Sequence, residues 1–329
     1  MNQKRVSTLS AMLYCVALFL LPALLVAQTP PWPMHGHDAK HTARSAVSGN
    51  TELNTALDNP QIISLGANAM YSPVIGPNNE VYLVTVGSGS IYQIHKFDSN
   101  GSEITGGNWP ISPPNTSDEI RSAPAIASDG TLYVVWDRPL AQEGLLYAYN
   151  PNGSAKWATP YALGVGTPSS SLVVDTFDAV YINGFPDGIQ VINADKSPKC
   201  TISNIDAYKI PVIGDDGSIY VPGGHDVFGS YDGGFSAYTS NCSPKWSKDY
   251  SGSSSNLSLF TSPVIASNGL VYTARWFQQT PNNYTLLALN PDDGSIVCQL
   301  NVPSSWTPTG CSWRSARTIR LCLPPPTIT

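Results

Sequence analysis

The sequence predicts an all-β fold, a β-propeller of four-stranded antiparallel blades, and three observations support this prediction. Five segments repeat one pattern in which two anchor positions are always nine residues apart. Each segment reads as two hairpins, enough for one blade in roughly 40–50 residues. The chain of 329 residues contains 27 Gly and 28 Pro, and only 12% of its residues are charged, which is typical of turn-rich β structure.

The first hairpin of each unit contains both anchors. The first anchors are Pro73, Pro124, Leu172, Pro211 and Pro263, and the second anchors are Tyr82, Tyr133, Tyr181, Tyr220 and Tyr272. Turns such as Asp129-Gly130 and Asp216-Gly217 separate them, because Gly accepts positive φ and Asx side chains bond their own backbone. The flanking runs are apolar on both faces, which predicts strands buried on both sides. We therefore expect the five tyrosines to be blade-packing anchors.

The second hairpin lies in the later half of each unit. Repeat two continues from 146–149 through a turn at 150–153 into 154–157, and repeat five follows the same plan with a slightly longer turn. Trp157 and Trp246 end their units and are predicted as further blade-packing anchors. Cys200 and Cys298 occupy the same position in repeats three and five, whereas repeat one is the loosest of the five.

A propeller explains the repetition better than the alternatives do. One four-stranded blade cannot bury both of its faces, whereas blades stacked around an axis can. A β-solenoid has shorter coils, and a β-sandwich gives no reason for a fivefold repeat. The spacing between successive first anchors varies as 51, 48, 39 and 52 residues, so the connections change length while the hairpin stays constant. Five blades are few, and we expect an incomplete ring.

The first 27 residues are predicted to be a signal peptide. Lys4 and Arg5 form a positive n-region, 11–26 is an apolar run interrupted by Pro22, and Ala27 offers a small residue for cleavage. The run is short for a membrane span. We expect a periplasmic or secreted protein with no stable membrane span after cleavage. Cys15 lies inside the run without a small residue before it, so lipidation is not expected.

The sequence divides into four parts. Residues 1–27 are the expected signal, 28–52 a Trp/His-containing segment, 53–302 the repeats and 303–329 a tail without the repeat signature. Within the repeats, 53–65 is expected to supply the outer strand of a closing blade. The tail begins where a sixth unit is due, and a frameshift near 305–312 is our hypothesis, because a shifted frame can encode a repeat-like stretch. Sequencing the locus tests it.

Few residues suggest chemistry. His35, His37 and His41 could supply imidazoles to a metal ion, but no Asp, Glu or Cys cluster with ligand spacing accompanies them, so no metal site is expected. The five Cys after the signal are odd in number. Cys200 and Cys298, at the Trp position of their repeats, are interpreted as packed apolar residues, while disulfides stay open. Net charge is −6 with no basic cluster beyond residue 5, which argues against nucleic acid as a partner.

The stretch from Trp32 to Ser45, WPMHGHDAKHTARS, together with the repeats resembles bacterial proteins with pyrroloquinoline-quinone-like (PQQ-like) β-propeller repeats. Their blades often carry an Ala-x-Asp-x-x-Thr-Gly-x-x-x-Trp motif whose Trp packs on the next blade. Ala288, Gly294 and Cys298 keep that spacing here. The resemblance covers about 32–302 and implies the quinoprotein-like fold. It implies no single function, because both enzymes and scaffolds use these blades.

We expect an exported, non-catalytic binding scaffold for a protein, peptide or glycan in the cell envelope. One alternative is a PQQ-dependent dehydrogenase, or a fragment of one, with Ca²⁺. Against it, the chain has no adjacent Cys pair, and its acidic residues lie mainly in turns, so no catalytic residue and no cofactor is assigned. Another alternative is an interaction module of an outer-membrane or surface assembly. Trp136, Arg138 and Arg275 follow the second strands of their repeats and are candidates either for a binding surface or for ordinary packing between blades.

Overall fold

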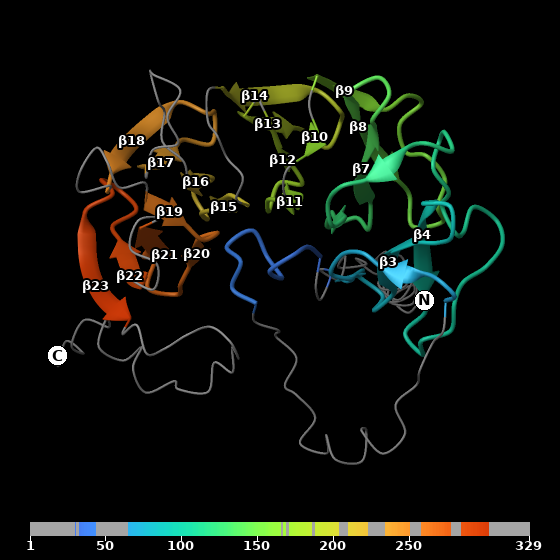
Figure 1. The fold of residues 1–329 in the computed structure, drawn as a ribbon, viewed down its shortest axis with the longest axis horizontal. Helices are drawn as coiled ribbons and strands as arrows, with labels where there is room; N and C mark the ends of the chain where they lie inside the picture. Colours follow the sequence, from blue (N-terminus) through green and yellow to red (C-terminus); the bar gives the residue numbers. More distant parts are fainter. Residues whose placement is uncertain are drawn as a thin grey trace, which may run out of the picture.

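A computed structural model describes residues 30, 33–43, 65–165, 167–168, 171–185, 188–203, 210–222, 234–250, 258–277 and 284–302. The expected signal peptide, the segment 53–64 and the tail 303–329 lie outside the described residues. Every element within the described residues is a β-strand. The fold is an all-β propeller whose five antiparallel sheets form an open arc with no closed sheet (Figure 1).

Five sheets form the blades, numbered in chain order. Blade one contains β1 (Asn68–Ala69), β2 (Val74–Ile75), β3 (Val81–Val86) and β4 (Tyr92–Phe97). Blade two contains β5 (Glu119–Ile120), β6 (Ala125–Ile126), β7 (Leu132–Arg138), β8 (Glu143–Tyr149) and β9 (Tyr161–Val165). Blade three contains β10 (Thr167–Pro168), β11 (Val173–Val174), β12 (Val180–Phe185), β13 (Gly188–Ile192) and β14 (Pro198–Ile202).

Blade four contains β15 (Val212–Ile213), β16 (Ile219–Pro222), β17 (Gly234–Tyr238) and β18 (Pro244–Asp249). Blade five contains β19 (Ser258–Phe260), β20 (Val264–Ile265), β21 (Val271–Phe277), β22 (Tyr284–Leu289) and β23 (Ile296–Val302). In blades one, two, three and five the innermost strand is split into two short pieces that both pair with the next strand. The first anchor stands at the split, and Pro suits this place because it has no N–H to give to a ladder.

Strand register explains why the anchor gap is constant. In every blade the residue after the first anchor pairs with the tyrosine, as Val74 does with Tyr82 and Val264 with Tyr272. The turn between them closes with the same backbone hydrogen bonds, for example from the Gly130 N–H to the Ala127 carbonyl at 3.0 Å. A residue with positive φ completes each turn, namely Asn79, Gly130, Asp178, Gly217 or Gly269. One extra residue would break this register.

The second hairpins follow the prediction in three blades and depart from it in two. In blades three, four and five the fourth strand contains Cys200, Trp246 and Cys298, as expected. In blade two the predicted strand at 154–157 is wrong, because only an isolated bridge between Tyr149 and Ala155 forms there and β9 takes the outer place. In blade one, isolated bridges such as Ile94–Ile111 replace a continuous fourth strand, which confirms that repeat one is the loosest.

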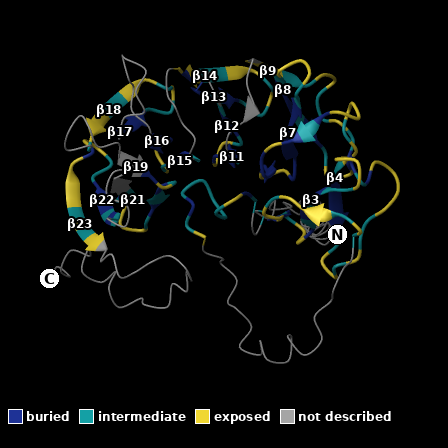
Figure 2. Cartoon of the chain, in the orientation of Figure 1, coloured by how far each residue is buried: buried dark blue, intermediate teal, exposed yellow. Residues whose placement is uncertain are grey.

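The buried hydrophobic residues that the structure describes form three clusters between neighbouring blades and do not form one central core. One cluster joins the facing sides of blades one and two, a second spans blades two, three and four, and a third joins blades four and five. Outer strands such as β18 and β23 are mostly exposed, whereas the inner strands are largely buried (Figure 2). Each blade is therefore stabilised mainly by its neighbours.

Candidate functional site at the propeller axis

Residues 33–43, here called the axial segment, occupy the centre of the arc (Figure 1). Consecutive turns fold the segment, with hydrogen bonds from the His37 N–H to the Met34 carbonyl at 3.0 Å and from the Ala43 N–H to the Gly36 carbonyl at 2.9 Å. Gly36 has a φ of 78°, and a Cβ there would lie 3.0 Å from the His41 ring. Only Gly fits this position without strain.

Asp38 holds the second half of the axial segment. Its carboxylate accepts the backbone N–H groups of Lys40 and Thr42 at 3.0 and 2.9 Å, and the Thr42 hydroxyl at 2.5 Å. Burial pushes the pKa of Asp38 upward, but the hydrogen bonds from Thr42 and His37 outweigh it and hold the pKa below its ordinary value. The Asp38 carboxylate therefore stabilises the fold of the axial segment.

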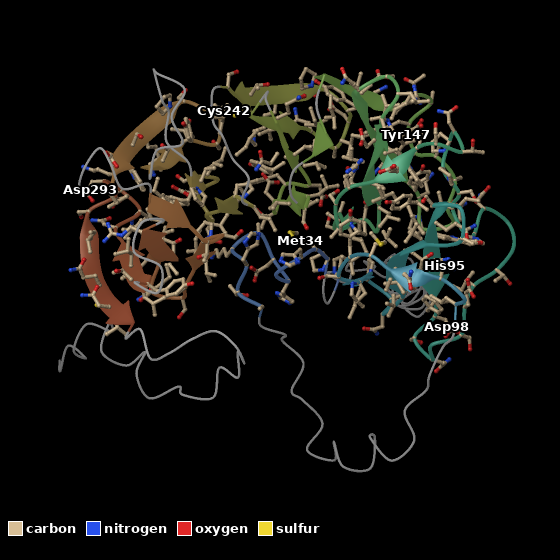
Figure 3. The ribbon with its side chains drawn as sticks, viewed as in Figure 1. Met34, His95, Asp98, Tyr147, Cys242 and Asp293 are labelled. Atoms are coloured by element: carbon tan, nitrogen blue, oxygen red, sulfur yellow. A yellow bond between two sulfur atoms is a disulfide. The ribbon has the colours of Figure 1, made fainter. Side chains whose placement is uncertain are left out.

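The axial segment contacts all five blades. The inner-strand N–H groups of Ile126, Ile213 and Ile265 donate to the carbonyls of Pro33, Ala39 and Lys40 at 2.8, 2.8 and 3.0 Å. In blade three the Val174 N–H approaches the Met34 sulfur at 3.5 Å, and Met34 lies at the centre of the arc in Figure 3. In blade one the Ser72 hydroxyl lies 3.4 Å from His35 Nδ1. The segment therefore satisfies buried donors that the innermost strands cannot pair among themselves.

The three histidines predicted as weak metal candidates lie in this segment. His35 and His41 meet edge to face with ring centroids 6.5 Å apart, while His37 Nδ1 lies 3.2 Å from Asp38. His41 is buried, and its pKa is lowered to about 4 by burial and by the neighbouring His35. Over the described parts of the chain, no three His, Cys, Asp or Glu side chains form a group that could hold a metal ion. The structure thus brings His35 and His41 into ring contact, whereas His37 lies beside Asp38.

The predicted anchors lie at the blade-to-blade contacts. Four of the five tyrosines are buried, and only Tyr272 is half-buried. Burial raises the pKa of the Tyr82, Tyr133 and Tyr181 phenols. Trp157 packs against Tyr133 with ring centroids 5.8 Å apart.

Trp246 crosses from blade four to blade five. Its Nε1–H donates to the Pro291 carbonyl at 2.8 Å, and a Cβ on Gly294 would lie 2.7 Å from the indole. Trp109 lies against Gly153 of blade two in the same way, at 3.1 Å from such a Cβ. We call this contact, between the fourth-strand position of one blade and the last turn of the next, a rim seam.

One rim seam is covalent. Cys200 of blade three, at the Trp position, forms a disulfide with Cys242 of blade four, with their Cα atoms 5.9 Å apart. Cys242 has a φ of 61° and stands in the turn at the place of Gly153 and Gly294. Cys298 is also disulfide-bonded. Disulfides were left open from the sequence, although Cys200 stands at the Trp position of repeat three and Cys242 at the turn Gly position of repeat four.

A charged patch lies where the loop ends of blades one and two meet. Arg121 bonds Glu119 at 2.9 Å and the buried Asp137 at 3.1 Å, and its side chain is half exposed. Arg138 reaches the buried Asp118 at 3.4 Å. Burial raises the pKa of Asp137, although the guanidinium of Arg121 opposes this rise. The arginines thus neutralise two buried carboxylates from the surface.

Half-buried aromatic side chains border this patch. The Tyr71 hydroxyl donates to the Ile120 carbonyl at 3.0 Å, and Tyr92 interacts with Glu119 and Arg121. Leu140, at the tip of the β7–β8 hairpin, is 90% exposed. Trp136 is fully buried in the core between blades one and two and donates its Nε1–H to the Tyr149 hydroxyl at 3.1 Å, so of its two predicted roles the structure supports packing between blades.

Solved structures share this fold. The quinohemoprotein alcohol dehydrogenase from Comamonas testosteroni matches with a TM-score of 0.54 and 17% identity, over 84% of this chain and 50% of that one. A europium-containing methanol dehydrogenase matches at 0.55 and 11%, over 83% and 58%. An ACO/RPE65 chimera matches at 0.52 and 10%, over 73% and 63%. This chain thus spans less than two thirds of each of these proteins.

No protein-family model and no curated protein sequence matches the chain. At identities of 10–17% the structural likeness shows the fold alone. It confirms the β-propeller fold predicted from the repeats. The matched structures include an alcohol dehydrogenase and an ACO/RPE65 chimera, so the shared fold does not by itself indicate a function. Within the described residues, no helix is long and apolar enough to cross a membrane.

Proposed function

We propose that this protein is an exported, non-catalytic propeller that binds a protein, peptide or glycan in the cell envelope through its surface. The observation that carries the proposal is the axial segment. Ligand sites in proteins are concave spaces where several elements converge, and in a propeller the blades converge on the central channel. Here the chain itself occupies that place and bonds the inner strands of blades two to five.

A PQQ cofactor with Ca²⁺ does not fit the described side chains. Such a group needs converging carboxylate and amide oxygens beside space for a planar ring system. The carboxylates nearest the axis are already used, because Asp38 bonds Thr42 and Asp215 lies 2.5 Å from Lys40 Nζ. Others cap turns, since Asp129 accepts the Thr131 N–H and Asp216 the Ser218 N–H, both at 2.9 Å. The donor set therefore favours a scaffold over a dehydrogenase.

The loop end of blades one and two is the surface that best supports partner binding. Tyr and Arg side chains are enriched where protein interfaces gain most of their energy. Arg121 is held in place by two carboxylates, so little side-chain entropy is lost when it meets a partner. Tyr92 and the exposed Leu140 add apolar contact area beside it.

Two measurements test the proposal. The full chain incubated with PQQ and Ca²⁺ should retain no quinone absorbance after dialysis, and it should not reduce dyes with alcohols or sugars. Immobilised protein should capture a defined partner from cell-envelope extracts or a glycan array. The L140S/Y92A variant should weaken that capture. The matched control is Phe177→Ser, because Phe177 is 75% exposed but lies in a turn at the opposite end of its blade.

Stoichiometric retention of PQQ with substrate-dependent dye reduction would establish the dehydrogenase alternative instead. Capture that survives L140S/Y92A but is lost in the Phe177→Ser control would move the binding surface to the other end of the propeller.

A further inference from the structure

Side chains at the two ends of the arc are more exposed than the side chains at equivalent repeat positions inside it. Each blade has a leading face, which packs on the next blade, and a trailing face, which packs on the preceding one. The repeats allow a position-by-position comparison of these faces. The anchor tyrosine marks the leading face, and the residue before it in sequence marks the trailing face. At all four internal contacts both positions are at most 3% exposed.

The leading face of blade five is apolar and incompletely covered. Tyr272 pairs with Ala288, which pairs with Cys298, so these three lie on one face. In the same way Ala274, Leu286 and Leu300 follow one another across the sheet. Val264, Tyr272, Ala274, Leu286 and Leu300 are all half-buried. Their counterparts on blade one, Val74, Tyr82 and Val84, are at most 1% exposed.

The trailing face of blade one shows the same difference. Ile75, Val81 and Leu83 are half-buried. Their counterparts on blade two, Ile126, Leu132 and Val134, are at most 1% exposed and belong to the core between blades one and two. The arc therefore ends in two sheet faces with half-buried apolar side chains along their inner strands, where the equivalents elsewhere are covered by a neighbouring blade. Part of each face is already covered, since Ala288 is buried on the first, and His95, which pairs with Leu83 on the second, is buried in an ion pair with Glu103. Apolar patches of this kind mark interaction surfaces.

We propose that these two faces join copies of the chain head to tail, with the leading face of blade five on one copy docking against the trailing face of blade one on another. The four internal contacts of the chain are the precedent, because each already pairs a leading face with a trailing face. The side chains match that precedent, with Tyr272 and Leu286 facing Val81 and Leu83. A contact between two different faces is heterologous, and it closes into a ring only if the rotation permits.

Blocking one face on each copy tests this arrangement. The Leu83→Arg variant loses the trailing face and Leu286→Arg loses the leading face, because a buried Arg without a partner is costly. By light scattering coupled to size exclusion, the wild-type chain should contain two or more copies. Each variant alone should be a single copy. An equal mixture should form a complex of two copies and no more, because each partner keeps one complementary face.

The control is Phe177→Arg, which should assemble like the wild type because Phe177 is 75% exposed and lies in the β11–β12 turn of blade three, away from both faces. A wild-type chain that stays a single copy at high concentration would overturn the proposal. So would variants that assemble normally, or a mixture that fails to pair although circular dichroism shows both variants folded.

A second measurement uses the wild-type chain and so tests the proposal even if the variants do not fold. Hydrogen exchange at low and high protein concentration should show concentration-dependent protection only in peptides containing 81–86 and 284–289. Protection that does not change with concentration, or that changes in blade three, contradicts the proposal.

Discussion

The axis and the rim of this propeller hold its blades by different means. At the axis, backbone N–H groups of the inner strands bond the axial segment, and the acceptors are mostly carbonyl oxygens. At the rim, three seams depend on particular side chains, with Trp109 against Gly153, Trp246 against Gly294, and a disulfide between Cys200 and Cys242. Backbone hydrogen bonds can form with many different side chains, whereas contacts between particular side chains are lost when one of them is replaced. We therefore expect the stability of the axial contacts to depend on backbone geometry and protonation, and the stability of the rim seams to depend on single side chains.

The largest effect is expected at the covalent rim seam. The double variant C200S/C242S should lose about 4 kcal/mol of unfolding free energy, because the disulfide links residues 42 apart and restricts the unfolded chain. Urea denaturation without reductant measures the loss. Ser243→Ala in the same turn is the control and should change little. A loss below about 1 kcal/mol would show that this seam is held by packing alone.

The axis should respond to pH through His41. The folded pKa of about 4 lies below the ordinary value of 6.5, so the unfolded chain binds the proton more tightly. The free energy of unfolding should therefore fall as the pH drops from about 6.5 to about 4, by up to about 3 kcal/mol, and level off below. The His41→Gln variant should lack this component. Parallel pH profiles for the two proteins would contradict the burial of His41 at the axis.

The non-covalent rim seam should give an intermediate effect. Trp246→Ala removes the contact with Gly294, the stacking on Phe235 and the hydrogen bond to Pro291, and should cost about 2–3 kcal/mol. Trp246→Phe keeps an aromatic ring and should cost about 1 kcal/mol. Thermal and urea melts measure both. Equal losses for the two variants would mean that ring packing contributes little.

The smallest effects are expected for two Gly→Ala substitutions, and comparing them separates the cost of backbone strain from the cost of a clash with Trp246. Gly269→Ala should cost about 1 kcal/mol, since its φ is 79° but nothing lies near a new Cβ. Gly294→Ala should cost more, because its Cβ also meets Trp246. In the Trp246→Ala background this excess should disappear. If the excess loss of unfolding free energy persists in this double-mutant cycle, the Trp246 indole is not the reason that Gly is required at position 294.

Much of the rim could be predicted from the sequence, because its determinants are side chains at fixed spacing. The gap from Pro73 to Tyr82 gave the hairpin register, since a pairing slip would turn apolar residues outward. The fourth strand of blade two was missed because the predicted strand 154–157 forms only an isolated bridge at Ala155, and the later segment Tyr161–Val165 pairs with β8 instead. The Cys200–Cys242 bond was missed because its partners lie in different repeats.

The axis was harder to predict. Trp32 to Ser45 was noticed as a motif, but nothing in its residues shows that carbonyls of Pro33, Ala39 and Lys40 accept hydrogen bonds from distant blades. Backbone acceptors leave no pattern in a sequence. The histidines drew attention as metal candidates instead, because imidazoles are conspicuous. Gly36 was a local sequence signal of a constrained segment, in which His37, His41 and Ala43 also have positive φ.

Hydrogen exchange at the inner strands tests the central claim, that the axial segment bonds the blades, most directly. The amide protons of Ile126, Ile213 and Ile265 should be protected in the wild-type chain. They should lose protection together in Gly36→Ala, which forces a Cβ against the His41 ring, while Gly269→Ala should spare Ile126 and Ile213. Rapid exchange of these amides in the wild-type chain, or unchanged protection in a folded Gly36→Ala variant, would contradict the account.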